Sequence, residues 1–149
     1  MSDEIVTVRP FGPSDRDALV AGRDAESRRW LGPESADPSP TACIEVDGTT
    51  VGWVDADPNA AWLDHGEVNV GYNVFPGHRG RGYASRAVRL LLEELRGDPG
   101  VVAALFVIDP DNAPSHRVAG AVGAQRAVDR TYPHDARQIV YAVELSRSP

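Results

Sequence analysis

The segment from residue 67 to residue 96 constrains the fold most, because it predicts a strand, a short loop and a long helix in direct succession. Residues 67 to 74 alternate without interruption, with polar residues or glycine at odd positions and apolar residues at even ones, which is typical of a strand. From Ala84 to Leu95 apolar residues recur at helical spacing, and Gly97 ends the helix. A strand that leads into an amphipathic helix requires a sheet with helices packed against it.

The N-terminal part of the chain predicts one strand followed by helical structure. Residues 5 to 9 alternate between polar and apolar types, except for Ile5, and Pro10 is expected to end the strand. Ser14 or Asp15 can cap a helical stretch that continues towards the first proline-rich loop. Because Gly22 interrupts this stretch, we expect either one long helix or two short ones.

A loop and a hairpin precede the strand at residues 67 to 74. Residues 33 to 40 contain several prolines without periodicity and are expected to form a loop. Residues 42 to 46 and 50 to 54 flank Asp47-Gly48, and this dipeptide favours a tight turn between antiparallel strands.

The C-terminal third predicts a buried strand, a helix and two further strands. Residues 101 to 108 form a continuous apolar run, which is typical of a strand covered on both faces. Asp111 or Asn112 can cap the helix that follows, and Gly123 is expected to end it. Residues 124 to 130 and 138 to 145 are expected to form the last two strands. The resulting order, βααβββαβαββ, predicts a mixed sheet flanked by helices.

Length and charge limit the classes of function. A chain of 149 residues is expected to form one domain over residues 1–149 with one core. Its net charge of −7 argues against binding nucleic acid. The first residues are acidic and no apolar run reaches the roughly 18 residues of a membrane span, so we expect a cytoplasmic protein without membrane partners.

Cysteine and histidine do not predict a metal centre. Cys43 is the only cysteine, and it lies in an apolar stretch where a buried packing residue is expected. The histidines match no ligand spacing on one helix or turn, so no metal is expected. They are His65, His78, His116 and His134.

The loop from His78 to Ala84 carries the chemistry that the sequence indicates most clearly. A glycine-rich turn from strand to helix presents several backbone N–H groups beside the positive end of the helix dipole, which binds phosphate. Gly80 and Gly82 allow close approach of an anion, and the guanidinium groups of Arg79 and Arg81 can donate further hydrogen bonds. An ordinary helix start with solvated arginines remains the alternative. The loop lacks the spacing of nucleoside triphosphate and dinucleotide sites.

The hexapeptide Arg79-Gly80-Arg81-Gly82-Tyr83-Ala84 matches R/Q-x-x-G-x-G/A, the signature of the GNAT superfamily of N-acyltransferases. The chain resembles this family over nearly its whole length. Residues 28 to 33 resemble the second helix of the RimJ/RimL-type branch, and residues 109 to 115 resemble its N-x-x-S turn. The resemblance implies a mixed α/β fold, with a mostly antiparallel sheet of six to seven strands and about four helices. It also implies acetyl-CoA as co-substrate.

The resemblance implies a set of cofactor-binding residues. In the family, the fourth strand separates from the fifth, and its exposed backbone pairs with the pantetheine arm of the cofactor. Carried over, Asn73, Val74 and Phe75 line the arm, Asn112 hydrogen-bonds the cofactor, and Ser115 lies near its sulfur. The residues whose amides would hold the pyrophosphate are Arg79, Gly80, Arg81, Gly82, Tyr83 and Ala84.

Acyl transfer to an amine requires a proton acceptor, a group that polarises the carbonyl and a proton donor for the departing thiolate. Glu67 occupies the position where many relatives place a general base, although a solvated strand-end carboxylate is an equal alternative. Ser115 is the first candidate for the general acid, unless its hydroxyl only satisfies a helix amide. The other candidates for that role are Tyr72, Tyr132 and Tyr141.

The sequence therefore predicts an acyl-CoA-dependent N-acetyltransferase that acts on a small amine or on a protein N-terminus. A non-catalytic acyl-CoA-binding module is the alternative, because no general base is unambiguous. A toxin that acetylates aminoacyl-tRNA is disfavoured by the negative charge. Members of this family are often dimers, which allows a homodimer here, but no residues identify an interface. The acceptor cannot be read from the sequence.

Overall fold

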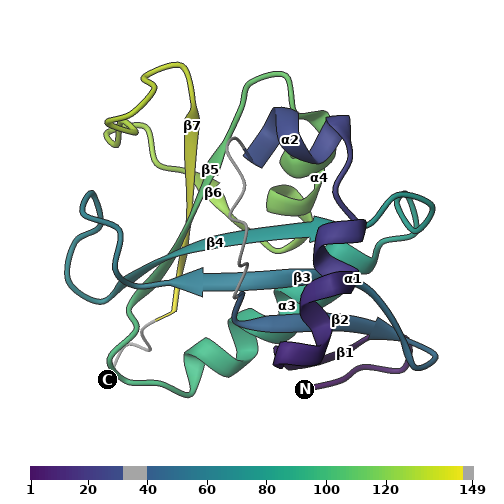
Figure 1. Ribbon diagram of the computed structural model, residues 1–149. Helices are drawn as coiled ribbons and strands as arrows, with labels where there is room; N and C mark the ends of the chain where they lie inside the picture. Colours follow the sequence, from purple (N-terminus) through teal and green to yellow (C-terminus); the bar gives the residue numbers. More distant parts are fainter. Residues whose placement is uncertain (32–39, 146–149) are drawn as a thin grey trace. The chain divides into compact units, whose positions relative to one another are not determined.

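The computed structural model describes residues 1–31 and 40–145. In chain order, the elements are β1 (Thr7–Pro10), a 3-10 turn (Pro13–Asp15), α1 (Arg16–Ala21), α2 (Ala25–Leu31), β2 (Ala42–Val46), β3 (Thr49–Asp57), β4 (Glu67–Val74), α3 (Tyr83–Arg96), β5 (Ala103–Ile108), α4 (Ala113–Ala121), β6 (Gln125–Arg126) and β7 (Ile139–Glu144). Figure 1 shows these elements along the chain. The strands form one seven-stranded sheet in the order β1-β2-β3-β4-β5-β7-β6.

The predicted fold class is confirmed. The pairs β1–β2, β2–β3, β5–β7 and β6–β7 are antiparallel, whereas β4 and β5 are parallel. The parallel pair follows from the α3 crossover, because parallel neighbours need a long connection between them. In the described part of the chain, no helix has the length and apolar character needed to cross a membrane.

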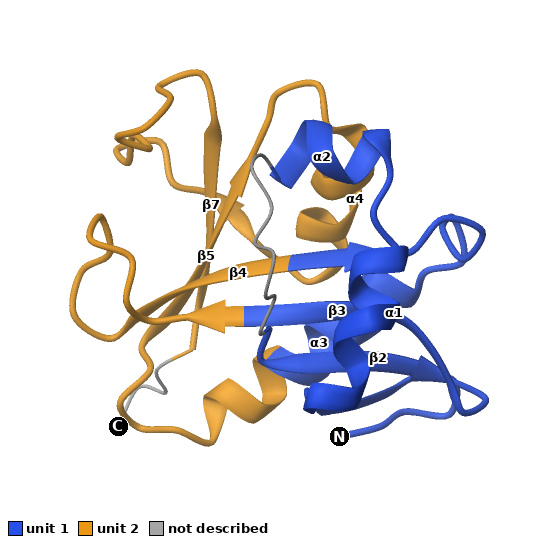
Figure 2. Ribbon diagram, viewed as in Figure 1, with its two compact units in different colours: residues 1–55, 72–91 blue, residues 56–71, 92–149 orange. Residues whose placement is uncertain are grey.

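The first of two compact units comprises residues 1–55 and 72–91, coloured blue in Figure 2. Its strands β1 to β3 form an antiparallel meander. The N–H of Phe75, just beyond β4, donates to the carbonyl of Val51 in β3 at 2.8 Å. Leu19, Cys43 and Phe75 pack together, joined by Phe11 and Trp53, so the start of the loop after β4 is anchored in this core. Cys43 is completely buried, as expected.

The second unit comprises residues 56–71 and 92–149, coloured orange in Figure 2. Strand β5 is its centre, and β7 pairs with every residue of β5 from Ala103 to Ile108. On its other side β5 pairs with β4 only over three residues of each strand, from Glu67 to Asn69 and from Ala103 to Leu105. Within this unit, Val70 and Gly71 continue β4 without pairing to β5, so the two strands separate after Leu105.

Most predicted elements form within a few residues of their expected bounds. The helical stretch near Gly22 divides into two short helices, α1 and α2. The hairpin turn at Asp47-Gly48 has positive φ at both residues, 50° and 77°, as a tight hairpin turn requires. The loop predicted at residues 33 to 40 lies, apart from Pro40, outside the described residues. A single domain over 1–149 stays a prediction.

The first and sixth strands differ from expectation. Strand β1 begins at Thr7 and includes Pro10, which pairs with Ala42 at the end of an edge strand, where a missing N–H is tolerated. The expected strand from 124 to 130 is reduced to β6, which pairs over two residues. The rest of the expected strand buries little apolar surface, since Val128 is 85% exposed.

Gly52 in β3 provides a test of the contact between β3 and the end of β4. A Cβ at this position would overlap the carbonyl oxygen of Asn73 and lie 3.0 Å from the Cα of Val74. Because both atoms belong to backbone, Gly52→Ala should lower the free energy of unfolding by about 3 kcal/mol, measured by urea denaturation.

Gly120→Ala is the matched control, because Gly120 lies in α4 and nothing lies within 4 Å of its would-be Cβ. There alanine should raise the free energy of unfolding by about 0.5 kcal/mol. Equal effects of the two substitutions would show that β3 and β4 are not in this contact.

Candidate functional site

The loop between β4 and α3 has the backbone conformation that its glycines allow. Gly80 and Gly82 have φ of 78° and 80°, in the left-handed region that other residues rarely adopt. Nothing lies within 4 Å of a Cβ built on either glycine, so the dihedral angle and not crowding requires glycine. Gly80, Arg81 and Gly82 are exposed.

Helix α3 begins with free amides that face this loop. The carbonyl of Gly82 accepts from the N–H of Arg86 at 3.2 Å, which is the first hydrogen bond of the helix. The preceding amides, from Tyr83 to Ser85, have no intrahelical acceptor, and within the described part of the chain they meet no other acceptor. Together with the helix dipole, they form a site suited to an anion.

Arg79 differs from the sequence expectation, because its side chain turns away from this anion site. Its Nε donates to the carbonyl of Val74 at 2.8 Å, and its Nη1 and Nη2 donate to the Asp24 carboxylate at 2.7 and 3.1 Å. Further bonds reach Glu26 at 2.9 Å and Asn73 at 3.4 Å. All five guanidinium N–H groups are thus directed at protein acceptors, and Arg81 is the exposed cation left at the loop.

Asp24 connects this arginine to helix α2. Its carboxylate accepts from the N–H of Ser27 at 2.9 Å, while the Ser27 hydroxyl accepts from the N–H of Asp24 at 2.9 Å. This reciprocal cap fixes the start of α2. Hydrogen bonds from Arg79 hold the pKa of Asp24 well below its usual range, so the carboxylate is ionised at neutral pH.

The residues expected along the pantetheine arm lie at the end of β4, and some of their backbone groups already have partners. The Val74 carbonyl accepts from Arg79, and the Phe75 N–H donates to Val51. Asn73 is 8% exposed. Tyr72 lies on the opposite face of β4 from Asn73, because successive residues of a strand alternate, and its hydroxyl oxygen is buried.

Glu67, the expected general base, is held by Arg130. Its Oε2 accepts from Arg130 Nη1 at 2.8 Å and its Oε1 from Nη2 at 3.0 Å. The Asp64 N–H adds a third bond, at 2.7 Å. The Glu67 side chain is 12% exposed, and the bonds from Arg130 lower its pKa. Its carboxylate is therefore held in an ion pair, and a catalytic role for Glu67 stays a prediction.

Asn112 and Ser115 stand at the start of α4. Asn112 is 8% exposed, and its Oδ1 accepts from the N–H of Ser115 at 3.4 Å as the N-cap of the helix. The alternative role for the Ser115 hydroxyl was to cap the helix, but in the structure the side chain of Asn112 caps α4. The Asn112 side-chain nitrogen and the half-buried Ser115 hydroxyl take no part in that bond.

His116 joins α4 to β7 in a contact that the sequence did not predict. Its Nδ1 lies 2.9 Å from the hydroxyl of Tyr141, and its Nε2 lies 3.0 Å from the backbone carbonyl oxygen of Asp109. The side chain of Gln138 donates to the Asp109 carboxylate at 3.2 Å. His116 follows Ser115 directly, but its partner lies 25 residues away, and no short motif connects them.

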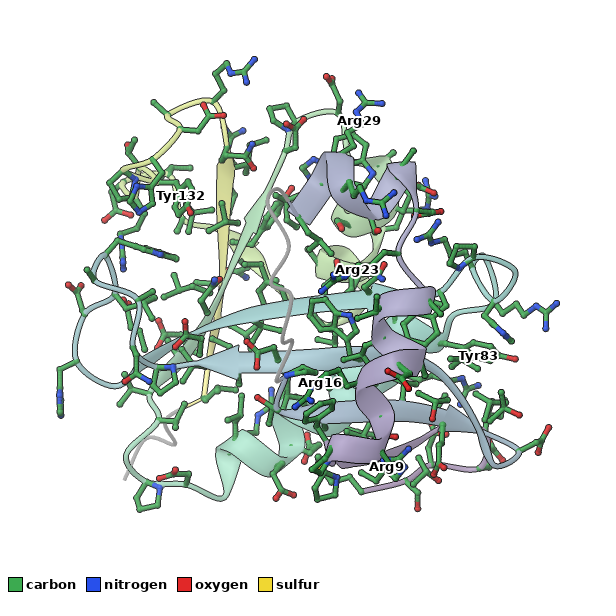
Figure 3. The ribbon with its side chains drawn as sticks, viewed as in Figure 1. Arg9, Arg16, Arg23, Arg29, Tyr83 and Tyr132 are labelled. Carbon is green, nitrogen blue, oxygen red and sulfur yellow. The ribbon has the colours of Figure 1, made fainter. Side chains whose placement is uncertain are left out.

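Aromatic rings gather on the two loops of the second unit that border Glu67. Trp62 and Tyr132 meet edge to face with centroids 5.4 Å apart, and His134 packs on Tyr132 at 5.1 Å. Figure 3 shows Tyr132 within a dense group of side chains on the loop before β7. Among residues 1–31 and 40–145, no group of three or more histidine, cysteine, aspartate or glutamate side chains is placed to hold a metal ion.

The Asp24–Arg79 pair should contribute stability only while the carboxylate is ionised. Because the folded pKa is lowered, this stability is present above the ordinary aspartate pKa and is lost as the pH falls through the folded pKa. Asp24→Asn should therefore lower the free energy of unfolding at pH 7 by about 1 kcal/mol, since the pair is partly exposed. In urea titrations, the difference in the free energy of unfolding between Asp24→Asn and the unmodified protein should become smaller as the pH falls below about 4.

Asp17→Asn serves as the control for this prediction, because Asp17 is an exposed aspartate on the neighbouring helix α1. It should change stability little at any pH. If Asp24→Asn lowered the free energy of unfolding by the same amount at every pH, the ion-pair explanation would be contradicted.

Comparison with known proteins identifies the family and structures with the same fold. A family model described as "Acetyltransferase (GNAT) domain" matches residues 6–125. No curated protein sequence matches the chain significantly.

Solved structures share the fold at low sequence identity. An acetyltransferase from Agrobacterium tumefaciens str. C58 is 20% identical with a TM-score of 0.80, covering 96% of this chain and 92% of that one. The aminoglycoside acetyltransferase AAC(6')-Ib in complex with coenzyme A is 21% identical with a TM-score of 0.78, and the match covers 93% of this chain and 94% of that one. Mycobacterium smegmatis RimJ in complex with CoA-disulfide is 19% identical with a TM-score of 0.74, and the match covers 93% of this chain and 81% of that one. At these identities the similarity concerns the fold.

Proposed function

Because the chain belongs to the GNAT acetyltransferase family, we propose that it transfers an acetyl group from acetyl-CoA to a primary amine by direct attack. The observation that carries this proposal is the start of α3, where left-handed glycines at 80 and 82 lead into free helix amides. This arrangement suits a pyrophosphate, and exposed Arg81 adds a positive charge. Acetyl-CoA supplies both the anion and the acyl group.

The cofactor contacts are proposed residue by residue. The amides from Arg79 to Ala84 bind the pyrophosphate, and the side chain of Arg79 supports the loop through Asp24 without touching the ligand. Arg79 occupies the carbonyl oxygen of Val74. Other backbone groups of Asn73 and Val74 bind the pantetheine arm, which also lies against Phe75. Asn112 can donate from its side-chain nitrogen, because only its oxygen caps α4.

The acceptor is proposed to be a cationic small amine or a protein N-terminus. A net charge of −7 favours a positively charged acceptor. Among proteins with this fold, one structure is an aminoglycoside acetyltransferase bound to coenzyme A and kanamycin, and another is RimJ. The motif at residues 28 to 33 supports the RimJ/RimL-type branch.

Catalytic roles for Glu67, Ser115 and Tyr72 are kept as proposals, although Glu67 is bound to Arg130. The Ser115 hydroxyl can approach a cofactor sulfur near the start of α4, since Asn112 performs the capping. Removing a proton through Glu67 would require weakening two hydrogen bonds from a cation. This restraint favours the second candidate function, an acyl-CoA-binding module without transfer activity.

Incubation with acetyl-CoA and one primary amine at a time separates the two functions. The amines are kanamycin, spermidine and a short peptide with a free α-amino group. We expect coenzyme A thiol release together with a mass increase of one acetyl group on at least one amine. Saturable acetyl-CoA binding with no acetylated amine would instead support the binding module.

Paired substitutions of the Glu67–Arg130 pair test the role of Glu67. Glu67→Gln and Arg130→Gln remove the same ion pair, so both should lower kcat by a similar factor of less than about 10. A general base at Glu67 would instead make Glu67→Gln slower than Arg130→Gln by about 100-fold or more, measured in steady-state acetyl transfer.

A further inference from the structure

We propose that Asp24 is a positioning residue for acetyl-CoA, which acts through Arg79 so that ligand binding at the loop after β4 and the folding of helix α2 stabilise each other. This inference rests on the proposed function, because it takes that loop as the site of the cofactor pyrophosphate. Helix α2, the loop and the start of α3 all belong to the first compact unit, coloured blue in Figure 2.

Helix α2 buries little of its own surface. Of its seven residues, all of them described, Ser27 is buried and Trp30 is half-buried, whereas the other five are exposed. Helices this short are unstable in isolation and are held mainly by the packing of an apolar face. Because α2 has little such packing, the hydrogen bonds at its start supply much of its stability, and α2 is an element that can open locally.

One carboxylate serves both the helix and the loop. Asp24 Oδ1 accepts from the N–H of Ser27 at 2.9 Å and from Arg79 Nη2 at 3.1 Å, and its Oδ2 accepts from Arg79 Nη1 at 2.7 Å. Glu26, in the first turn of α2, accepts from the same Nη1 at 2.9 Å. The folded first turn holds both carboxylates in place, so Arg79 loses acceptors when that turn opens.

Arg79 is itself a residue of the loop. Its Nε donates to the Val74 carbonyl at 2.8 Å, and Gly80, with its left-handed backbone, follows it directly. From Gly80 to Gly82 the loop is exposed, and nothing lies within 4 Å of a Cβ built on either glycine, so packing against them does not order the loop. A glycine-rich segment has many alternative conformations, and fixing Arg79 removes many of them.

Two weakly held elements that share one ion pair are thermodynamically coupled. A ligand that selects the ordered loop fixes Arg79 and with it the start of α2, and by linkage the opening of α2 weakens ligand binding by the same factor. The Asp24 and Glu26 side chains are 30% and 49% exposed, and ion pairs in contact with water are weak. The coupling factor should therefore be about fivefold, at the lower end of such effects.

Amide hydrogen exchange of α2 in the full chain, with and without acetyl-CoA, tests the coupling. Saturating acetyl-CoA should slow the exchange of the amides of residues 28–31 about fivefold. Asp24→Asn should abolish this slowing, because asparagine still caps α2 but binds Arg79 without a charge. Ser27→Ala removes only the bonds of the Ser27 hydroxyl to the Asp24 backbone and leaves the Arg79 bonds intact, so the slowing should persist.

Binding and steady-state kinetics give the reciprocal measurement. In Asp24→Asn, the Kd and the KM for acetyl-CoA should both rise about fivefold, whereas kcat should change less than twofold, because Asp24 acts on the loop and does not touch the reacting atoms. Asp17→Asn, on the exposed side of the neighbouring helix α1, is the control and should change neither binding nor exchange.

The possible results separate the coupling from the proposed function. If acetyl-CoA binds the unmodified protein without slowing exchange in α2, or slows it equally in Asp24→Asn, the coupling alone is overturned. Loss of the slowing in both Asp24→Asn and Ser27→Ala would assign the effect to the cap of α2 and overturn the role of Arg79. Absence of acetyl-CoA binding to the folded, unmodified protein would overturn the proposed function and the coupling with it.

Discussion

The five hydrogen bonds of the Arg79 guanidinium are the interaction on which the loop after β4 depends. They join the end of β4, through Val74 and Asn73, to the capped start of α2, through Asp24 and Glu26. A glycine-rich loop loses much conformational entropy on ordering, so it needs such an anchor. With the anchor in place, the left-handed residues lead directly into the free amides at the start of α3.

Two arginines near the proposed site are bound to carboxylates and serve structure, whereas Arg81 is exposed. Arg79 and Arg130 each hold an acidic side chain in the ionised state, Asp24 and Glu67 respectively. The backbone amides of α3 carry no net charge, so an acidic protein can still offer a local site for an anion.

Sequence patterns predicted the local elements well, since period and turn chemistry are local properties. Strand β4 and helix α3 formed almost as expected, and Asp47-Gly48 made the hairpin turn. Contacts between distant residues could not be predicted in the same way. Arg79 was expected at phosphate but meets Asp24, 55 residues away, and Glu67 was expected as a base but meets Arg130, 63 residues away. No local motif encodes either partner, and the same holds for His116 and Tyr141.

Isothermal titration of acetyl-CoA into the protein and into Gly82→Glu tests the account most directly, with Gly48→Glu as the matched variant. Both glycines have nearly equal positive φ, 80° and 77°, and open space around a Cβ, so both substitutions strain the backbone alike. Only Gly82→Glu places a carboxylate at the start of α3. The account predicts saturable binding that survives in Gly48→Glu and is lost in Gly82→Glu. Equal binding by both variants, or none by the folded unmodified protein, would contradict it.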